Sequence, residues 1–238
     1  MLLATVVLTT SAALFASQSQ STTPSERISE AWWNQRHEEK VALTSSRKAD
    51  LAFLGDSITH GWETTGRQTW DKYYSHRNAA NFGFSGDQTQ HVLWRLANGE
   101  LIGMQPKVVV IMIGTNNIGN GQISASDTAV GVAKIVRTLQ ASIPKVKILL
   151  LSIFPRGMTM NDNGRVRTIE ASRWFQSLAD PGKVVCLDIG KYFLNRSGDI
   201  RVGLMPDLLH PNEKGYEIWA MAMERELAGL IGDAPIPH

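Results

Sequence analysis

The sequence predicts an α/β domain built on a mainly parallel, five-stranded sheet with helices on both faces. Short apolar segments alternate along the chain with longer stretches of helical periodicity, which is typical of such a sheet. The strand candidates are mostly apolar, as expected for strands buried on both faces. They are bounded by Gly, Pro, Asn or Asp and comprise residues 51–54, 79–82, 108–113, 148–152 and 184–188.

A charged segment precedes the first strand. Residues 25–48 have the spacing of a helix packed on the outside of the domain and contain Trp32 and Trp33. Aromatic residues on such a lead-in helix usually belong to the core, although a pair of tryptophans is also able to bind a sugar.

Helical patterns follow later strands. Ser124 and Asp127 form a start signal for a helix that ends at Pro144. Residues 165–178 predict another helix. The last helix has an inner stripe that consists of Tyr216, Trp219, Ala220, Met223 and Leu227.

Size and composition limit the range of functions. The 238 residues, 43% of them hydrophobic, are enough for one well-buried domain and short for two. Lys and Arg number 24 against 22 Asp and Glu, with no long run of like charge, so we expect no nucleic-acid or anionic-membrane surface. The single cysteine, Cys186, excludes an intramolecular disulfide and a cysteine-based metal cluster, and we expect it in the core.

The N-terminus predicts export. Residues 1–16 are apolar, and small residues suitable for cleavage follow, so we interpret 1–19 as a signal peptide of a secreted or periplasmic protein. No basic residue precedes the apolar run, and the run is short for a membrane span, although an N-terminal anchor stays an alternative. After it we expect a lead-in at 20–48, one catalytic domain at 49–232 and a tail at 233–238, with disorder at 17–23 and after Gly232.

The first chemical candidate is Ser57 in Gly55-Asp56-Ser57, directly after a buried strand candidate. Ligands of open α/β sheets bind beyond the carboxyl ends of the strands, so this serine is placed where chemistry is usually done. A serine nucleophile needs a general base and donors for the oxyanion. Taken alone, the tripeptide is more typical of a turn or a helix cap than of a nucleophile.

The general base candidate is His210, because Asp207 lies three residues before it and Pro211 restrains its backbone. Within one turn the carboxylate can accept from one ring nitrogen while the other faces the serine. A surface loop that caps a helix is the alternative. The remaining histidines, which we expect to be structural or solvated, are His37, His60, His76, His91 and His238.

Donors for an oxyanion follow two further strand candidates. Gly86 can bring a bare backbone N–H close to a substrate, and the side-chain amide of Asn116 can reach the same point, with the N–H of Ser57 as a third donor. Ser85 is a poor rival nucleophile, because the motif around it lacks the glycine that a nucleophile elbow has two residues after its serine.

These motifs resemble the blocks of the GDSL, or SGNH, hydrolase family in their expected order. Asn81 to Leu101, Gly114-Thr-Asn-Asn117 and Phe154-Pro-Arg-Gly157 are similar to the catalytic subunits of platelet-activating-factor acetylhydrolase and their bacterial relatives. The resemblance implies a three-layer, flavodoxin-like α/β/α fold and ester hydrolysis through an acyl-enzyme without metal or organic cofactor. It also implies a triad and an oxyanion hole made of Ser57, Asp207, His210, Gly86 and Asn116.

For the substrate we expect short acyl esters, chiefly acetyl groups on carbohydrate. The resemblance to acetylhydrolases, combined with export, motivates this expectation. Substrate contacts are expected from Asp56, Arg156 and Trp62, although the arginine could equally brace a loop and the tryptophan could simply pack in the core. The alternatives are a lysophospholipase or thioesterase and, from another class, a non-catalytic glycan-binding protein. A homodimer stays open.

Overall fold

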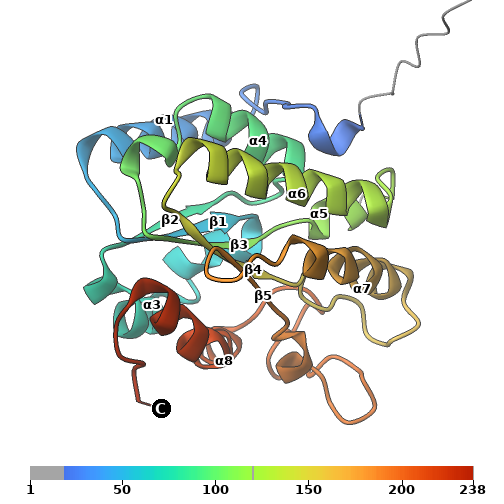
Figure 1. The fold of residues 1–238 in the computed structure, drawn as a ribbon. Helices are drawn as coiled ribbons and strands as arrows, with labels where there is room; N and C mark the ends of the chain where they lie inside the picture. The colour runs from blue at the N-terminus through green and yellow to red at the C-terminus, as the bar shows by residue number, and fades with distance from the viewer. Residues whose placement is uncertain (1–18, 120, 238) are drawn as a thin grey trace, which may run out of the picture.

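The computed structural model describes residues 19–119 and 121–237, and its centre is one five-stranded sheet (Figure 1). The strand order is β2-β1-β3-β4-β5, and every neighbouring pair is parallel. The predicted strands and their arrangement are therefore confirmed, with ends that differ by at most one residue. Their bounds are Leu51–Gly55 (β1), Ala79–Gly83 (β2), Val108–Met112 (β3), Lys147–Leu151 (β4) and Val184–Leu187 (β5).

Helices cover both faces of this sheet, which gives the three layers (Figure 1). One face carries α1 (Ala31–Ser46), α4 (Thr89–Ala97), α6 (Ala125–Ser142) and α7 (Asn163–Phe175), and the other carries α3 (Arg67–Tyr73) and α8 (Glu213–Ile231). Two short helices, α2 (Ser57–His60) and α5 (Thr115–Gly119), follow β1 and β3 directly. The 3₁₀ turns are η1 (Gln20–Thr22), η2 (Gly61–Glu63), η3 (Ser75–Arg77), η4 (Ile102–Met104), η5 (Gln176–Leu178) and η6 (Gly190–Phe193).

The side-chain alternation of each strand divides the core in two. In β1, Ala52 and Leu54 pack into the layer under α4 and α6, whereas Leu51 and Phe53 pack into the layer under α3 and α8. Because both layers are apolar, the strands carry no polar face, which explains their predominantly hydrophobic sequence.

The predicted start of the helix at Ser124 and the predicted inner stripe of the last helix are confirmed. The hydroxyl of Ser124 accepts from the backbone N–H of Asp127 at 3.0 Å and so caps α6. Every residue of the predicted inner stripe of α8 is buried. The lead-in helix is shorter than predicted, because it begins at Ala31 and not at residue 25.

Two expectations of disorder are wrong for the residues that the structure describes. Ser21 is fully buried, since its hydroxyl donates to the carbonyl of Asp127 at 2.6 Å and its own carbonyl accepts from Thr89 Oγ1 at 2.9 Å. In the tail, the carboxylate of Asp233 lies 2.8 Å from Nε of Arg77. Polar composition predicted loops at both ends, but these long-range partners order them. The predicted signal peptide lies outside the described residues, apart from its last position.

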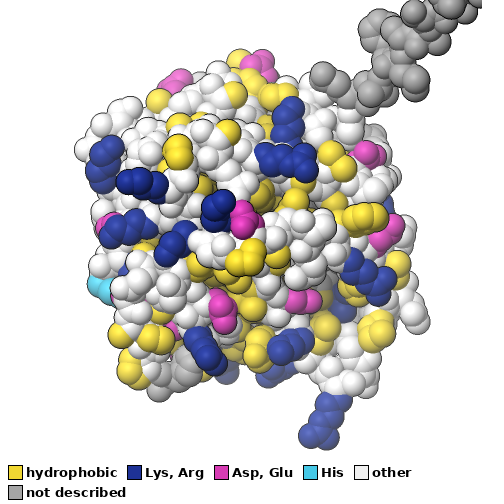
Figure 2. Space-filling model, viewed as in Figure 1, with side chains coloured by type: hydrophobic (Ala, Val, Ile, Leu, Met, Phe, Trp, Pro, Cys, Tyr) yellow, Lys and Arg dark blue, Asp and Glu magenta, His cyan; other side chains and the backbone are white. Residues whose placement is uncertain are grey.

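The surface agrees with the balanced composition. Figure 2 shows basic, acidic and apolar side chains on the visible face, with the basic ones most frequent on its left half. Among residues 19–119 and 121–237, no helix combines the length and the apolar character needed to cross a membrane.

Candidate active site

Ser57, His210 and Asp207 form one hydrogen-bonded chain. Ser57 begins α2 directly after β1, and its Oγ lies 2.8 Å from Nε2 of His210. The other ring nitrogen, Nδ1, lies 2.6 Å from Oδ2 of Asp207. The structure thus brings together three side chains, of which Ser57 and His210 are 153 residues apart in the sequence.

The turn 207–210 positions the carboxylate of Asp207 against the imidazole of His210. Oδ1 of Asp207 accepts from the backbone N–H groups of Leu209 at 3.1 Å and His210 at 2.7 Å. Leu208 has a φ of +63°, a left-handed conformation that is costly for a branched side chain. This compact turn lets the Asp207 carboxylate meet the imidazole of a residue only three positions away.

The carboxyl of Asp207 keeps its negative charge. Burial is the largest influence and raises its pKa, but the hydrogen bonds from the His210 side chain and backbone together outweigh burial and hold the pKa below its usual value. A charged carboxylate here keeps the proton on Nδ1 of His210 and leaves Nε2 free to accept from Ser57.

Three potential oxyanion donors lie beyond the ends of β1, β2 and β3. The N–H of Ser57 is the first of α2 and has no intrahelical acceptor. Gly86, with a φ of +78°, follows β2, and Asn116 belongs to α5 after β3. Nδ2 of Asn116 donates to the carbonyl of Asp87 at 2.9 Å, which fixes the amide beside Gly86 and leaves its second N–H available.

A buried ion network supports the Gly86 loop, and sequence reasoning missed it. The fully buried carboxylate of Asp87 accepts from Trp33 Nε1 at 2.8 Å, Arg27 Nη1 at 2.9 Å and Arg95 Nε at 2.8 Å. Arg95 is also fully buried and pairs with Glu100. Asp87, Arg95 and Glu100 all fall in the long segment that carries the family resemblance, which was the available signal for their importance.

The structure corrects two predicted substrate contacts. Trp62 has no exposed surface and packs among Phe53, Trp70 and other core aromatic rings. Asp56 is also fully buried, and its Oδ1 caps α2 by accepting from the N–H of Ile58 at 3.0 Å. Both side chains point into the core. The motif pattern alone could not show in which direction they point.

The Asp56 carboxyl is nevertheless unusual. Its Oδ2 has no hydrogen-bond partner among the described residues, and burial raises the pKa of this carboxyl to about 7. Asp56 directly precedes Ser57 in the sequence.

The remaining described histidines have structural contacts or are exposed. His37 contacts Glu100 at 2.7 Å, and Nδ1 of His91 accepts from the N–H of Gln88 at 3.0 Å. Nδ1 of His60 lies 3.0 Å from the hydroxyl of Ser85, which connects the nucleophile helix to the Gly86 loop. Burial, followed by the charge of Arg36, lowers the pKa of His60 to about 4, so this ring is neutral at pH 7.

Arg156 lies in the same cavity lining as Asp207, and its predicted substrate contact stays a prediction. Its Nη1 donates to the carbonyl of Thr115 at 2.7 Å and to the hydroxyl of Thr115 at 3.1 Å, and so braces α5. The cavity has a volume of about 430 Å³. In the part of the chain that the structure describes, no cluster of three His, Cys, Asp or Glu residues is arranged to hold a metal ion.

The parallel sheet and the Ser57–His210–Asp207 chain are those of a serine-type carboxylic ester hydrolase. Residues 53–218 match the model of the GDSL-like lipase/acylhydrolase family, and the chain belongs to that family. The predicted family and fold are therefore confirmed.

Curated relatives agree with this assignment. The alpha1 subunit of bovine platelet-activating factor acetylhydrolase IB is 32% identical over 216 residues, which cover 87% of this chain and 89% of the relative. The rat alpha2 subunit is 33% identical over 204 residues, with 85% and 86% covered.

Solved structures share the fold. A GDSL-like lipase from Bacteroides thetaiotaomicron superposes with a TM-score of 0.67 at 18% identity and covers 81% of this chain and 97% of its own. Axe2, an acetylxylan esterase from Geobacillus stearothermophilus, superposes with a TM-score of 0.61 at 19% identity, with 79% and 96% covered.

Proposed function

We propose that this ester hydrolase removes short acyl groups, chiefly acetyl, from oxygen esters through an acyl-enzyme on Ser57. The observation that carries the proposal is the hydrogen-bonded chain from Ser57 Oγ through His210 to Asp207. The donors of Ser57, Gly86 and Asn116 lie next to it at the ends of three neighbouring strands.

The proposed reaction has two steps. His210 Nε2 takes the proton of Ser57 while Oγ attacks the ester carbonyl, and the three N–H donors bind the oxyanion. His210 then gives this proton to the departing alcohol, and the acyl group stays on Ser57. In the second step His210 deprotonates a water molecule as its oxygen attacks the acyl carbon. The bond from that carbon to Ser57 Oγ then breaks, His210 returns the proton to Oγ, and the acid is released. Asp207 stabilises the imidazolium in both steps.

The acetyl preference is supported by the relatives' names. An acetyl ester is the shared element of the platelet-activating factor acetylhydrolases and the acetylxylan esterase, whereas the alcohols named differ. We propose carbohydrate as the alcohol. Trp32 on α1 supports this choice, because the residue is 41% exposed and its ring stacks with that of His60 at 6.4 Å between centroids. Trp33, by contrast, is fully buried.

The proposal also places the enzyme outside the cytoplasm. Its basis is the apolar segment 1–16 followed by small residues. N-terminal sequencing of the protein exported by a host cell tests this point, and a mature chain that starts near residue 20 is expected. Retention of residues 1–19 in the cytoplasm would contradict it.

Hydrolysis of p-nitrophenyl esters from acetate to octanoate, with Ser57→Ala run in parallel, tests the chemistry. We expect rates that fall steeply beyond propionate and are abolished in the variant. Acetylated xylo-oligosaccharides then test the alcohol. A preference for octanoate would instead indicate a lysophospholipase or thioesterase, and equal rates in wild type and variant would remove Ser57 from the mechanism.

A further inference from the structure

A cavity of about 430 Å³ opens between two parts of the active site. Asp207, Leu208 and Leu209 line one side, and Ile118 and Gly119 of α5 line another. The first segment immediately precedes His210, whose imidazole protonates the departing alcohol, and the second follows Asn116 of the oxyanion hole. On the proposed mechanism, this cavity therefore lies on the alcohol side of the scissile bond.

Two arginines line the same cavity with unused donors. Arg156 donates to Thr115 from its Nη1 group only. Arg167 of α7 donates from Nη1 to the carbonyl of Ile118 at 3.0 Å and from Nη2 to the carbonyl of Ile123. A guanidinium carries five N–H groups, so each side chain keeps three for a ligand.

Neither guanidinium forms an ion pair with a described residue. Burial lowers the pKa of Arg156, and the one acidic group whose charge raises it is the fully buried Asp56 carboxyl. Within residues 19–119 and 121–237, no carboxylate oxygen lies within 4.0 Å of Arg156 or Arg167. The two acidic residues of the lining are engaged elsewhere, because Asp207 holds His210 and Asp162 accepts from the N–H of Thr159 at 2.7 Å. Partly buried charges are normally paired. Two unpaired cations around one cavity therefore favour an anionic ligand.

Glycines give Arg156 its position. A Cβ atom at Gly119 would lie 2.6 Å from Nη1 of Arg156, and a Cβ atom at Gly164 would lie 3.1 Å from its Cδ. The arginine thus occupies space that two missing side chains leave beside the cavity. This fit holds the guanidinium partly buried, and burial lowers its pKa.

We propose that this cavity is a subsite for an anionic group, a carboxylate or a phosphate, on the alcohol half of the ester. Arg156 and Arg167 donate to its oxygens, since the planar fork of arginine suits such groups. The inference rests on the proposed function and adds to it a charge preference for the alcohol. A long acyl chain does not suit this cavity, because charged side chains would lose their hydration to it.

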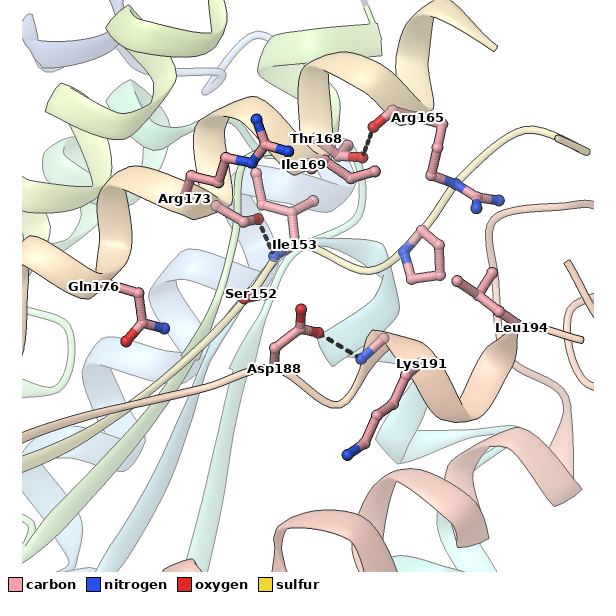
Figure 3. Close-up of a pocket in the computed structure, with 13 residues that line it drawn as sticks. Ser152, Ile153, Arg165, Thr168, Ile169, Arg173, Gln176, Asp188, Lys191 and Leu194 are labelled. Atoms are coloured by element: carbon pink, nitrogen blue, oxygen red, sulfur yellow. Dashed lines mark hydrogen bonds between the residues drawn. The ribbon is translucent and has the colours of Figure 1, made fainter. Parts of the chain in front are cut away.

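A second cavity supplies the control. It measures about 410 Å³, lies at the carboxyl ends of β4 and β5 and is lined by Arg173 of α7 and Lys191 of η6 (Figure 3). None of the triad residues lines it. Arg167 and Arg173 belong to the same helix but to different cavities, so Arg173→Gln removes the same charge away from the site.

The experiment compares three acetyl esters that differ only in the group at C6: methyl 3-O-acetylglucoside, the corresponding uronic acid and the corresponding 6-phosphate. For the full chain we expect kcat/KM for at least one charged ester to exceed that of the neutral ester by about ten- to a hundredfold. In Arg167→Gln this ratio falls toward one, and in Arg173→Gln it keeps the wild-type value. Arg167→Lys gives an intermediate ratio, because lysine keeps the charge without the fork.

The charged ester with the higher ratio identifies the group as carboxylate or phosphate. A wild-type ratio near one, or an equal loss in Arg167→Gln and Arg173→Gln, overturns the subsite. Cleavage of the neutral ester by the wild type and not by Ser57→Ala supports the proposed function whatever the ratio. If no ester is cleaved, the proposed function fails, and calorimetry with methyl glucuronide, methyl glucoside 6-phosphate and methyl glucoside still tests the subsite through their affinities.

Discussion

The side-chain amide of Asn116 donates a hydrogen bond of 2.9 Å to the backbone carbonyl of Asp87. This contact joins the loop after β3 to the loop after β2, which carries Gly86. Asp87 is itself anchored by Trp33, Arg27 and Arg95. One N–H of the amide is thereby fixed, so the direction of the other is fixed too, as a preorganised oxyanion donor requires.

Asn116→Ala removes this donor without touching the triad. We expect kcat to fall by about 10²–10³, the usual cost of losing one oxyanion donor. The measurement is steady-state hydrolysis of p-nitrophenyl acetate, with thermal unfolding to show that the variant is folded. An unchanged kcat would remove Asn116 from the oxyanion hole.

Gly86→Ala tests the backbone donor, and Gly182→Ala is its matched control. Both glycines have a φ of +78°, so each substitution costs about 1–2 kcal/mol of backbone strain. A Cβ atom at Gly86 would also lie 3.1 Å from Nη2 of Arg27, whereas at Gly182 it would meet nothing within 4 Å. We expect similar losses of stability but a fall in kcat only for Gly86→Ala. Equal activities in the two variants would argue against Gly86 as a donor.

Asp207→Asn changes the acid of the triad at nearly constant size. The Asn amide is able to donate to Nδ1 of His210, which moves the ring proton to Nε2 and prevents it from accepting from Ser57. Such a change of tautomer lowers kcat by up to about 10⁴. The readout is kcat for an acetyl ester, and circular dichroism confirms the fold. A variant that keeps more than a tenth of the wild-type kcat would show that Asp207 does not orient His210.

The parts of the structure that local chemistry determines could be predicted from sequence. Strands buried on both faces need continuous apolar runs, so their positions were evident to within one residue. The pairing of Asp207 with His210 follows from three-residue spacing on a restrained turn, and the Ser124 cap follows from residue type.

Features that depend on long-range contacts could not be predicted. Arg27 contacts Asp87 across 60 residues, and Arg77 meets Asp233 across 156, so neither pair leaves a local pattern. For the same reason the described parts of both predicted disordered segments proved ordered. The burial of Trp62 depends on η2 turning inward toward α8, where its ring packs on Trp219 at 4.9 Å. A motif that places a tryptophan near a serine in the sequence does not show in which direction the tryptophan side chain points.

Asp56→Asn should change how stability depends on pH. In the folded state burial raises the pKa of Asp56 to about 7 from the ordinary 3.8, so the folded chain binds the proton more tightly than the unfolded chain. The stability of the wild type therefore falls as pH rises from about 4 to about 7, and each pH unit between the two pKa values contributes up to about 1.4 kcal/mol. Asparagine removes this dependence, because it does not titrate and its carbonyl oxygen can still accept from Ile58.

Urea unfolding of wild type and variant at pH 4.5, 6 and 8 measures the effect. We expect the free energy of unfolding of Asp56→Asn, relative to wild type, to rise between pH 4.5 and 8. Asp50→Asn at the other end of β1 is the control, since its carboxylate is 41% exposed and pairs with Lys107 at 2.8 Å. A constant difference between Asp56→Asn and wild type across this range would mean that Asp56 is charged in the folded protein. In that case an unlocated donor must satisfy its second oxygen.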